Sequence, residues 1–160
     1  MGTRSEELAK KFDASCGEMN KTVEALSDAE WKKVTSAEKW LVGVVAHHVA
    51  LAHEGISELV QLVAKGQPLP TLTMDMIHAG NAQHAKEQAN VTKAETLALL
   101  KANGGKASGI VRGLSDAELD KSASVLVGMP AMTAAQAIEA VLINHVHEHL
   151  GSIRATTGAK

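Results

Sequence analysis

The sequence is poor in cysteine and in aromatic residues, and both shortages limit what the protein can be. Of its 160 residues, one is cysteine (Cys16), one is phenylalanine, two are tryptophan and none is tyrosine. A single cysteine cannot form an internal disulfide, and it excludes a CxxC redox or zinc motif. With so few aromatic rings, the core must be built from Ala, Leu, Val, Ile and Met, the residues that fill interfaces between helices. Cys16 lies on an apolar stripe with helical spacing, so we interpret it as a buried small hydrophobe rather than a reactive thiol.

The sequence also has no strong excess of charge and no long apolar run. Its 16 basic and 18 acidic residues give a net charge of -2. They are well mixed, so nothing favours a nucleic acid or an anionic membrane as a partner. No apolar segment approaches the length of a membrane span, and the N-terminal stretch MGTRSEELAKK lacks the apolar region of a signal peptide. We therefore expect a cytoplasmic protein.

Residues that break helices are rare as well. Proline occurs only at positions 68, 70 and 130, and the pair Gly-Gly only at 104–105. Helical periodicity dominates elsewhere and predicts helices over about 5–26, 35–65, 73–90, 92–114 and 133–156. Three of these begin at capping-box patterns: Thr35 with Glu38, Thr92 with Glu95, and Thr133 with Gln136. The apolar spacing continues through Gly-Gly, so we expect one helix there, weakened or bent. Residues 1–160 are thus predicted to form a single all-α domain, an up-down four-helix bundle with one additional helix or helical turn.

Histidine is the residue in excess, with eight copies in the chain. Three of them alternate in the stretch NHVHEHLGSIR, residues 144–154. At about 100° per residue, His145 and His149 lie inside the apolar arc of the last predicted helix, whereas His147 lies on its outer side. Two imidazoles four positions apart share a helix face, with Cβ atoms about 5–6 Å apart, and can chelate one metal ion. A hydrogen-bonded pair at an interface between helices would have the same spacing.

A further inward histidine comes from the stretch WLVGVVAHHVALAHE, residues 40–54. His48 is the polar side chain that interrupts the centre of a wide apolar arc, whereas His47 lies on the polar face and His53 at the edge of the arc. A neutral imidazole among valines and leucines needs either a hydrogen-bond partner or a metal. His48, His145 and His149 together match the ligand count of a three-histidine site with an open fourth position. We therefore predict a metal site formed by these three residues.

The third predicted helix carries a polar stripe formed by Asn81, His84 and Gln88. Either this stripe is solvated, or it lines a pocket over the metal, with His84 as an extra ligand or hydrogen-bonding group. We favour the pocket lining. Of the remaining histidines, we expect His53 and His78 to lie at helix edges and His47 and His147 to face solvent.

Together these residues resemble the DinB-like superfamily of metal-binding four-helix bundles, the DinB/YfiT-type proteins. The resemblance rests on Trp40, eight positions before His48, and on the HxxxH pair at 145–149 followed by Gly151, Ile153 and Arg154. It covers residues 12–154 and implies a bundle of that type that binds one divalent ion, commonly nickel or zinc, through His48, His145 and His149. Family members are often homodimers, and several are transferases or isomerases that use a low-molecular-weight thiol such as mycothiol, bacillithiol or glutathione.

The resemblance and the open coordination position lead to several functional hypotheses. The first is a thiol-dependent S-transferase-like enzyme, in which the metal activates a small thiol for reaction with an electrophile. The alternatives are a metal-dependent hydrolase, a non-catalytic stress-response protein that binds a metal or small ligand, and a bundle whose buried histidines bond to one another. The nearest acids in sequence, Glu54 and Glu148, are expected to point outward, so the catalytic residues, including any general base, remain unidentified. Activation of an added thiol requires less of the protein than hydrolysis does, and for this reason we rank it first. The maleylpyruvate-isomerase relatives carry an additional C-terminal domain that this sequence lacks, so we do not expect that particular reaction.

Overall fold

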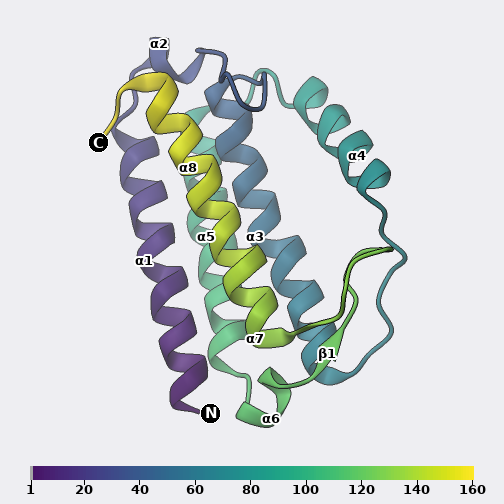
Figure 1. The fold of residues 1–160 in the computed structure, drawn as a ribbon. Helices are drawn as coiled ribbons and strands as arrows, with labels where there is room; N and C mark the ends of the chain where they lie inside the picture. Colours follow the sequence, from purple (N-terminus) through teal and green to yellow (C-terminus); the bar gives the residue numbers. More distant parts are fainter. Residues whose placement is uncertain (1) are drawn as a thin grey trace.

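The computed structural model describes residues 2–160, and most of them are helical (Figure 1). Within this range, four long helical segments pack side by side as a bundle: α1 (Thr3–Ala25), α3 (Val42–Lys65), α5 (Lys93–Arg112) and α8 (Asn144–Thr157). Helix α8 continues directly from the short α7 (Ala134–Ala137) and the π-helical segment η1 (Ile138–Ile143). The remaining elements are α2 (Asp28–Trp31), α4 (Met74–Glu87), α6 (Asp116–Leu119) and two short antiparallel strands, β1 (Ser122–Ala123) and β2 (Met132–Thr133). The predicted all-α four-helix bundle with an additional helix is confirmed.

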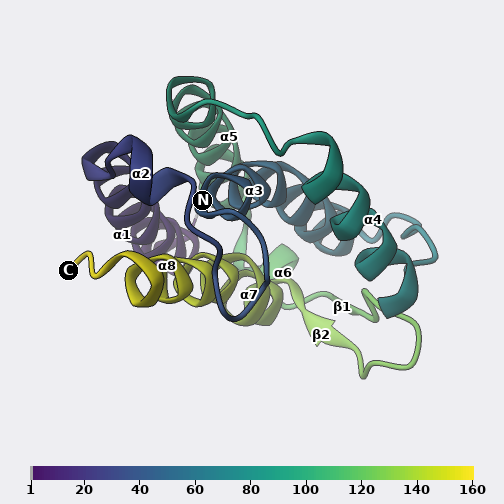
Figure 2. The ribbon, with the colours of Figure 1, turned by 90° about the horizontal axis from the view of Figure 1, so that it is seen from above.

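The additional helix α4 connects two neighbours in the bundle. In Figure 1, α1 and α8 run upward and α3 and α5 run downward, while α4 runs upward between α3 and α5 in the chain. Helices α3 and α5 therefore pack parallel to one another, and α4 is the crossover between them. The predicted up-down order is wrong in this respect, because the additional helix returns the chain to the same end of the bundle before α5 begins. Seen from above, α4 lies outside the four packed helices, next to α3 (Figure 2). None of the residues 74–87 is buried, so this helix covers the bundle loosely.

The core is aliphatic, as the composition predicts, and its residues recur every three or four positions along each helix. Helix α5 continues through Gly104 and Gly105 without a break. Gly104 is buried, and a Cβ atom there would lie 3.5 Å from Cys16 Sγ, whereas Gly105 faces open space. The buried Cys16 acts as a small hydrophobe, because its burial raises the pKa of the thiol to about 12. None of the helices in the described range is long and apolar enough to cross a membrane.

The predicted start of the second long helix at Thr35 is wrong. Helix α3 begins at Val42, and an antiparallel bridge between Val34 and Leu41 closes the preceding residues into a loop. The N–H of Thr35 donates to the carbonyl of Trp40 at 2.8 Å, and Lys39 has a φ of 64°, which a right-handed helix cannot accommodate. The capping-box pattern at 35–38 therefore caps nothing, whereas those at Thr92 and Thr133 are formed as predicted.

The prediction that His53 lies at a helix edge is also wrong. Its side chain is 1 % exposed, because α5 packs along α3, side chains of α1 reach His53, and α8 packs against α3 as well. The Phe12 ring meets it edge-on with centroids 5.2 Å apart, and Cys16 Sγ lies 3.8 Å from its Nε2 atom. Burial lowers the pKa of His53 from 6.5 to about 4.

This buried imidazole makes the stability of the metal-free protein depend on pH. Between pH 6.5 and about pH 4 the unfolded chain binds a proton at His53 that the folded chain does not, so stability falls as the pH falls. At about 1.4 kcal/mol per pH unit, the loss over this window amounts to about 3 kcal/mol. We expect His53→Leu to remove this part of the pH dependence, as measured by urea unfolding of both proteins at pH 7 and pH 4. Wild-type and variant stabilities that change in parallel would contradict the assignment.

Candidate metal centre

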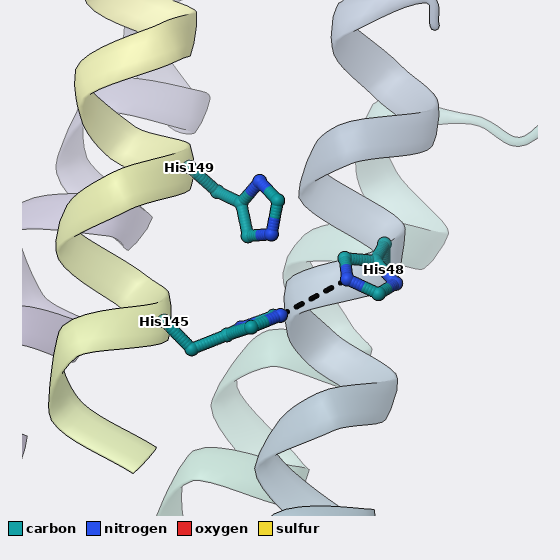
Figure 3. Close-up of side chains that lie close together, drawn as sticks. All are labelled: His48, His145 and His149. Atoms are coloured by element: carbon teal, nitrogen blue, oxygen red, sulfur yellow. Dashed lines mark hydrogen bonds between the residues drawn. The ribbon is translucent and has the colours of Figure 1, made fainter. Parts of the chain in front are cut away.

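Three histidine side chains from two helices converge between α3 and α8 (Figure 3). His48 lies in the second turn of α3, and His145 and His149 lie one turn apart on α8. The candidate ligand nitrogens of these residues all lie within 4.8 Å of one another. The Nε2 atoms of His48 and His145 are 3.0 Å apart. The structure thus brings together the three residues that the sequence nominated as ligands.

The protonation state of two of these rings, His48 and His145, suits a metal ion. Burial, reinforced by the neighbouring imidazoles, lowers the pKa of His48 to about 4 and that of His145 to about 2. Both rings are therefore neutral at pH 7 and carry a free lone pair on one nitrogen. A divalent ion requires neutral imidazole ligands, so the side chains are in the state that binding demands. Three imidazole nitrogens facing one point fit the donor set of a three-histidine site with an open position.

A carboxylate that the sequence interpretation did not place at the site bonds to the third histidine. Glu38 accepts a hydrogen bond from His149 Nδ1 at 2.9 Å and another from Ser152 Oγ at 2.6 Å. Burial tends to raise the pKa of Glu38, but hydrogen bonds, with that from Ser152 the largest among them, outweigh it and leave the pKa lowered. Sequence reasoning missed this contact because the capping-box pattern assigned the Glu38 side chain to the backbone of Thr35. Glu38 lies two residues before Trp40, which packs against His48. This is the one local signal in the sequence that Glu38 lies near the triad.

Two aromatic contacts complete the surroundings of His48. The Trp40 ring meets His48 edge-on, with centroids 5.4 Å apart. His84, on α4, lies with its ring centroid 5.9 Å from that of His48. His84 also stacks on His47, and its Nε2 atom is 2.7 Å from His47 Nδ1. The expectation that His47 faces solvent is therefore wrong: α4 lies over that side of α3 and leaves the ring half-buried.

The other predicted site residues lie as follows. Asn81 on α4 and Gln88, the residue that caps the C-terminus of this helix, are half-buried, and their role as pocket lining stays a prediction. His78 and His147 are exposed, and His147 bonds to Ser15 rather than to the triad.

The nearby acids and the exposure of the triad bear on what the site can do. Glu54 and Glu148 bond to Lys106 and Asn144, respectively, so neither carboxylate is directed at the triad. The side chain of His149 keeps 15 % of its surface exposed, so the site is accessible from solvent.

Comparison with protein families gives a match over most of the chain. The family model of the mycothiol maleylpyruvate isomerase N-terminal domain matches residues 12–151. This range includes the three histidines. It also includes the segment that joins α1 to α3 and the segment that joins α5 to α7. No curated protein matches the sequence significantly.

Comparison with solved structures gives matches over the whole chain. The mycothiol-dependent maleylpyruvate isomerase superimposes with a TM-score of 0.76 at 13 % identity, and the match covers 99 % of this chain and 64 % of the isomerase. This chain therefore spans less than two thirds of the length of that enzyme. YfiT from Bacillus subtilis, described as a probable metal-dependent hydrolase with an unusual four-helix bundle topology, superimposes with a TM-score of 0.74 at 16 % identity. That match covers all of this chain and 91 % of YfiT, and at these identities both comparisons establish the fold alone.

Proposed function

The chain belongs to the mycothiol maleylpyruvate isomerase N-terminal domain family, within the DinB-like four-helix bundles. On that premise we propose that it binds one divalent metal ion and activates a low-molecular-weight thiol for transfer to an electrophile. The observation that carries the proposal is the convergence of His48, His145 and His149. Nickel and zinc both accept three imidazole ligands, and we propose one of these two as the ion.

The chemistry of the proposed ion is that of a Lewis acid, which lowers the pKa of a thiol or water at its open position and favours a nucleophile near neutral pH. The residues of the chain supply the rest. The three imidazoles converge on one point, Glu38 accepts a hydrogen bond from His149 Nδ1, and Trp40 packs against His48. His84 approaches from α4 and would contact a ligand bound beside His48.

The occupancy of Glu38 favours thiol transfer over hydrolysis. Both carboxylate oxygens already accept hydrogen bonds, one from His149 and one from Ser152. Because Glu38 bonds to Nδ1 of His149, on the side of that ring away from His48 and His145, the carboxylate is not placed to act as a general base for a water attacking at the triad. A thiol is more acidic than water by several orders of magnitude, so it requires less assistance from the protein.

Metal-dependent hydrolysis is the second candidate. It is supported by the similarity to YfiT, which this chain matches over 91 % of YfiT's length, a larger share than the 64 % for the isomerase. A non-catalytic role in binding a metal or small ligand is the remaining outcome.

An activity screen with the metal-loaded protein separates these functions. We expect faster consumption of a chromogenic aryl halide in the presence of mycothiol, bacillithiol or glutathione than with the variant in which His48, His145 and His149 are all alanine. Ester hydrolysis without added thiol that depends on the same histidines would support the hydrolase instead. If neither reaction exceeds the rate of the triple variant, the proposal of catalysis fails and a binding function remains.

A further inference from the structure

Glu38 contacts the candidate metal centre from outside the three histidines. Its Oε1 atom is 2.9 Å from His149 Nδ1, and its Oε2 atom accepts from Ser152 Oγ at 2.6 Å. His149 and Ser152 lie three residues apart on α8, so the carboxylate bonds to two side chains on one turn of that helix. The side chains of Glu38 and His149 are only 11 % and 15 % exposed, which protects this contact from competition by water.

The direction of the hydrogen bond determines which nitrogen of the His149 ring carries the proton and which keeps a lone pair. An ionised carboxylate can only accept, so the Nδ1 atom of His149 must carry the proton that forms the bond. In a neutral ring this leaves the lone pair on Nε2. Figure 3 shows the distal nitrogen of His149 directed toward His48 and His145, and this is the nitrogen left free by the bond to Glu38.

The loop that carries Glu38 is held on both sides of it. The bridge between Val34 and Leu41 closes its base, and hydrogen bonds between Thr35 and Trp40 and between Lys39 and Thr35 span its interior. The backbone around Glu38 is therefore constrained, and the position of the carboxylate is set by the loop rather than by α8. Trp40 of the same loop packs edge-on against His48, so one loop contacts ligands on both helices.

From this geometry we infer that Glu38 is a positioning residue of the metal centre: it selects the tautomer of His149 and holds its ring so that Nε2 faces the ion. The inference rests on the proposed function, since it assigns a role within the same metal site. Carboxylates that orient a ligating histidine in this way commonly contribute one to two orders of magnitude to metal affinity. The competing explanation is that Glu38 only anchors the loop to α8.

Ser152 separates the two explanations, because it bonds to the same carboxylate but does not belong to the triad. Ser152→Ala removes one anchor of the loop and leaves the bond to His149 in place. Glu38→Ala removes both bonds, whereas Glu38→Gln keeps an oxygen that can accept from His149 Nδ1 but loses the charge and puts an NH₂ donor in place of the second oxygen. An anchoring role predicts similar effects for Ser152→Ala and Glu38→Ala. A positioning role predicts that only the change at Glu38 matters.

The test measures Zn²⁺ affinity of the full chain by competition with a chromophoric chelator, together with the tautomer of His149 by ¹⁵N NMR after metal removal. We expect affinity to fall about 10- to 100-fold in Glu38→Ala, to fall less in Glu38→Gln, and to change less than about threefold in Ser152→Ala. We expect His149 to be protonated at Nδ1 in the wild type and in Glu38→Gln, and to shift toward protonation at Nε2 in Glu38→Ala.

Wild-type affinity in Glu38→Ala, or a wild-type His149 protonated at Nε2, would overturn the inference. If Glu38→Ala does not fold, Glu38→Gln and Ser152→Ala decide the matter: loss of affinity in Ser152→Ala as large as in Glu38→Gln would overturn it. Failure of the proposed function has a different signature, namely a wild-type protein that binds no metal, and the tautomer is read independently of that result.

Discussion

Replacing His145 by alanine is expected to weaken the binding of Zn²⁺ or Ni²⁺ by more than about 100-fold. A residue that merely orients a ligand contributes up to about that factor, so the loss of a ligand itself should exceed it. Burial lowers the pKa of His145 further than that of His48, and its Nε2 atom lies 3.0 Å from that of His48. Without it, two imidazoles remain, and solvent must supply the other coordination positions. The affinity is measured by titration of metal-free protein against a competing chelator.

The same helix offers a matched control for this variant. His147 lies two residues away, is exposed, and bonds to Ser15 of α1. His147→Ala should therefore bind the ion with wild-type affinity. If His145→Ala retained the affinity, or if His147→Ala lost it to the same extent, the assignment of the inward pair on α8 would be wrong.

Removal of the metal is expected to lower the midpoint of thermal unfolding by about 8–16 °C. An ion that binds the folded chain alone stabilises it by about 4 kcal/mol when its free concentration is a thousand times the Kd. The ion is expected to bind the folded chain alone, because His48 and His145 are 97 positions apart in the chain and meet only when α3 and α8 pack. For a protein of about this size, each kcal/mol corresponds to about 2–4 °C.

Differential scanning calorimetry with Zn²⁺ and with excess chelator measures this shift. The variant His145→Ala provides the control. At the same free metal concentration, a site at least 100-fold weaker stabilises the fold by at most about 1.4 kcal/mol, so its midpoint should shift by about 3–6 °C at most. A wild-type midpoint that does not respond to the chelator, in a protein shown to release its metal, would contradict a site that bridges two helices.

The sequence predicted the helices well wherever local patterns determine them. The capping boxes at Thr92 and Thr133 and the periodic apolar residues of α1 and α5 act within a few positions, and these helices begin and end near the predicted residues. The spacing of His145 and His149 also lies within one regular helix, α8. The π-helical segment Ile138–Ile143 precedes them and changes the helical repeat, but it does not separate the pair.

The remaining features depend on contacts between distant residues, which no local pattern reveals. Glu38 bonds to α8, 111 positions away, rather than to the backbone three residues before it. His47 is half-buried because α4 returns over α3, and His53 is buried because helices cover α3 on more than one side. A helical wheel assigns one inner face to each helix. This assumption fails for α3, because α3 is buried on several of its faces.

The central claim is that one divalent ion binds to His48, His145 and His149, and X-ray absorption at the metal edge tests it most directly. For the zinc-loaded wild type, the extended fine structure should show three imidazole nitrogens at about 2.0–2.1 Å and the outer-shell scattering typical of imidazole rings. No sulfur from the protein should appear, because its single cysteine, Cys16, is buried against His53. A spectrum with fewer than three imidazoles, or with wild-type and His48→Ala proteins indistinguishable, would contradict the account.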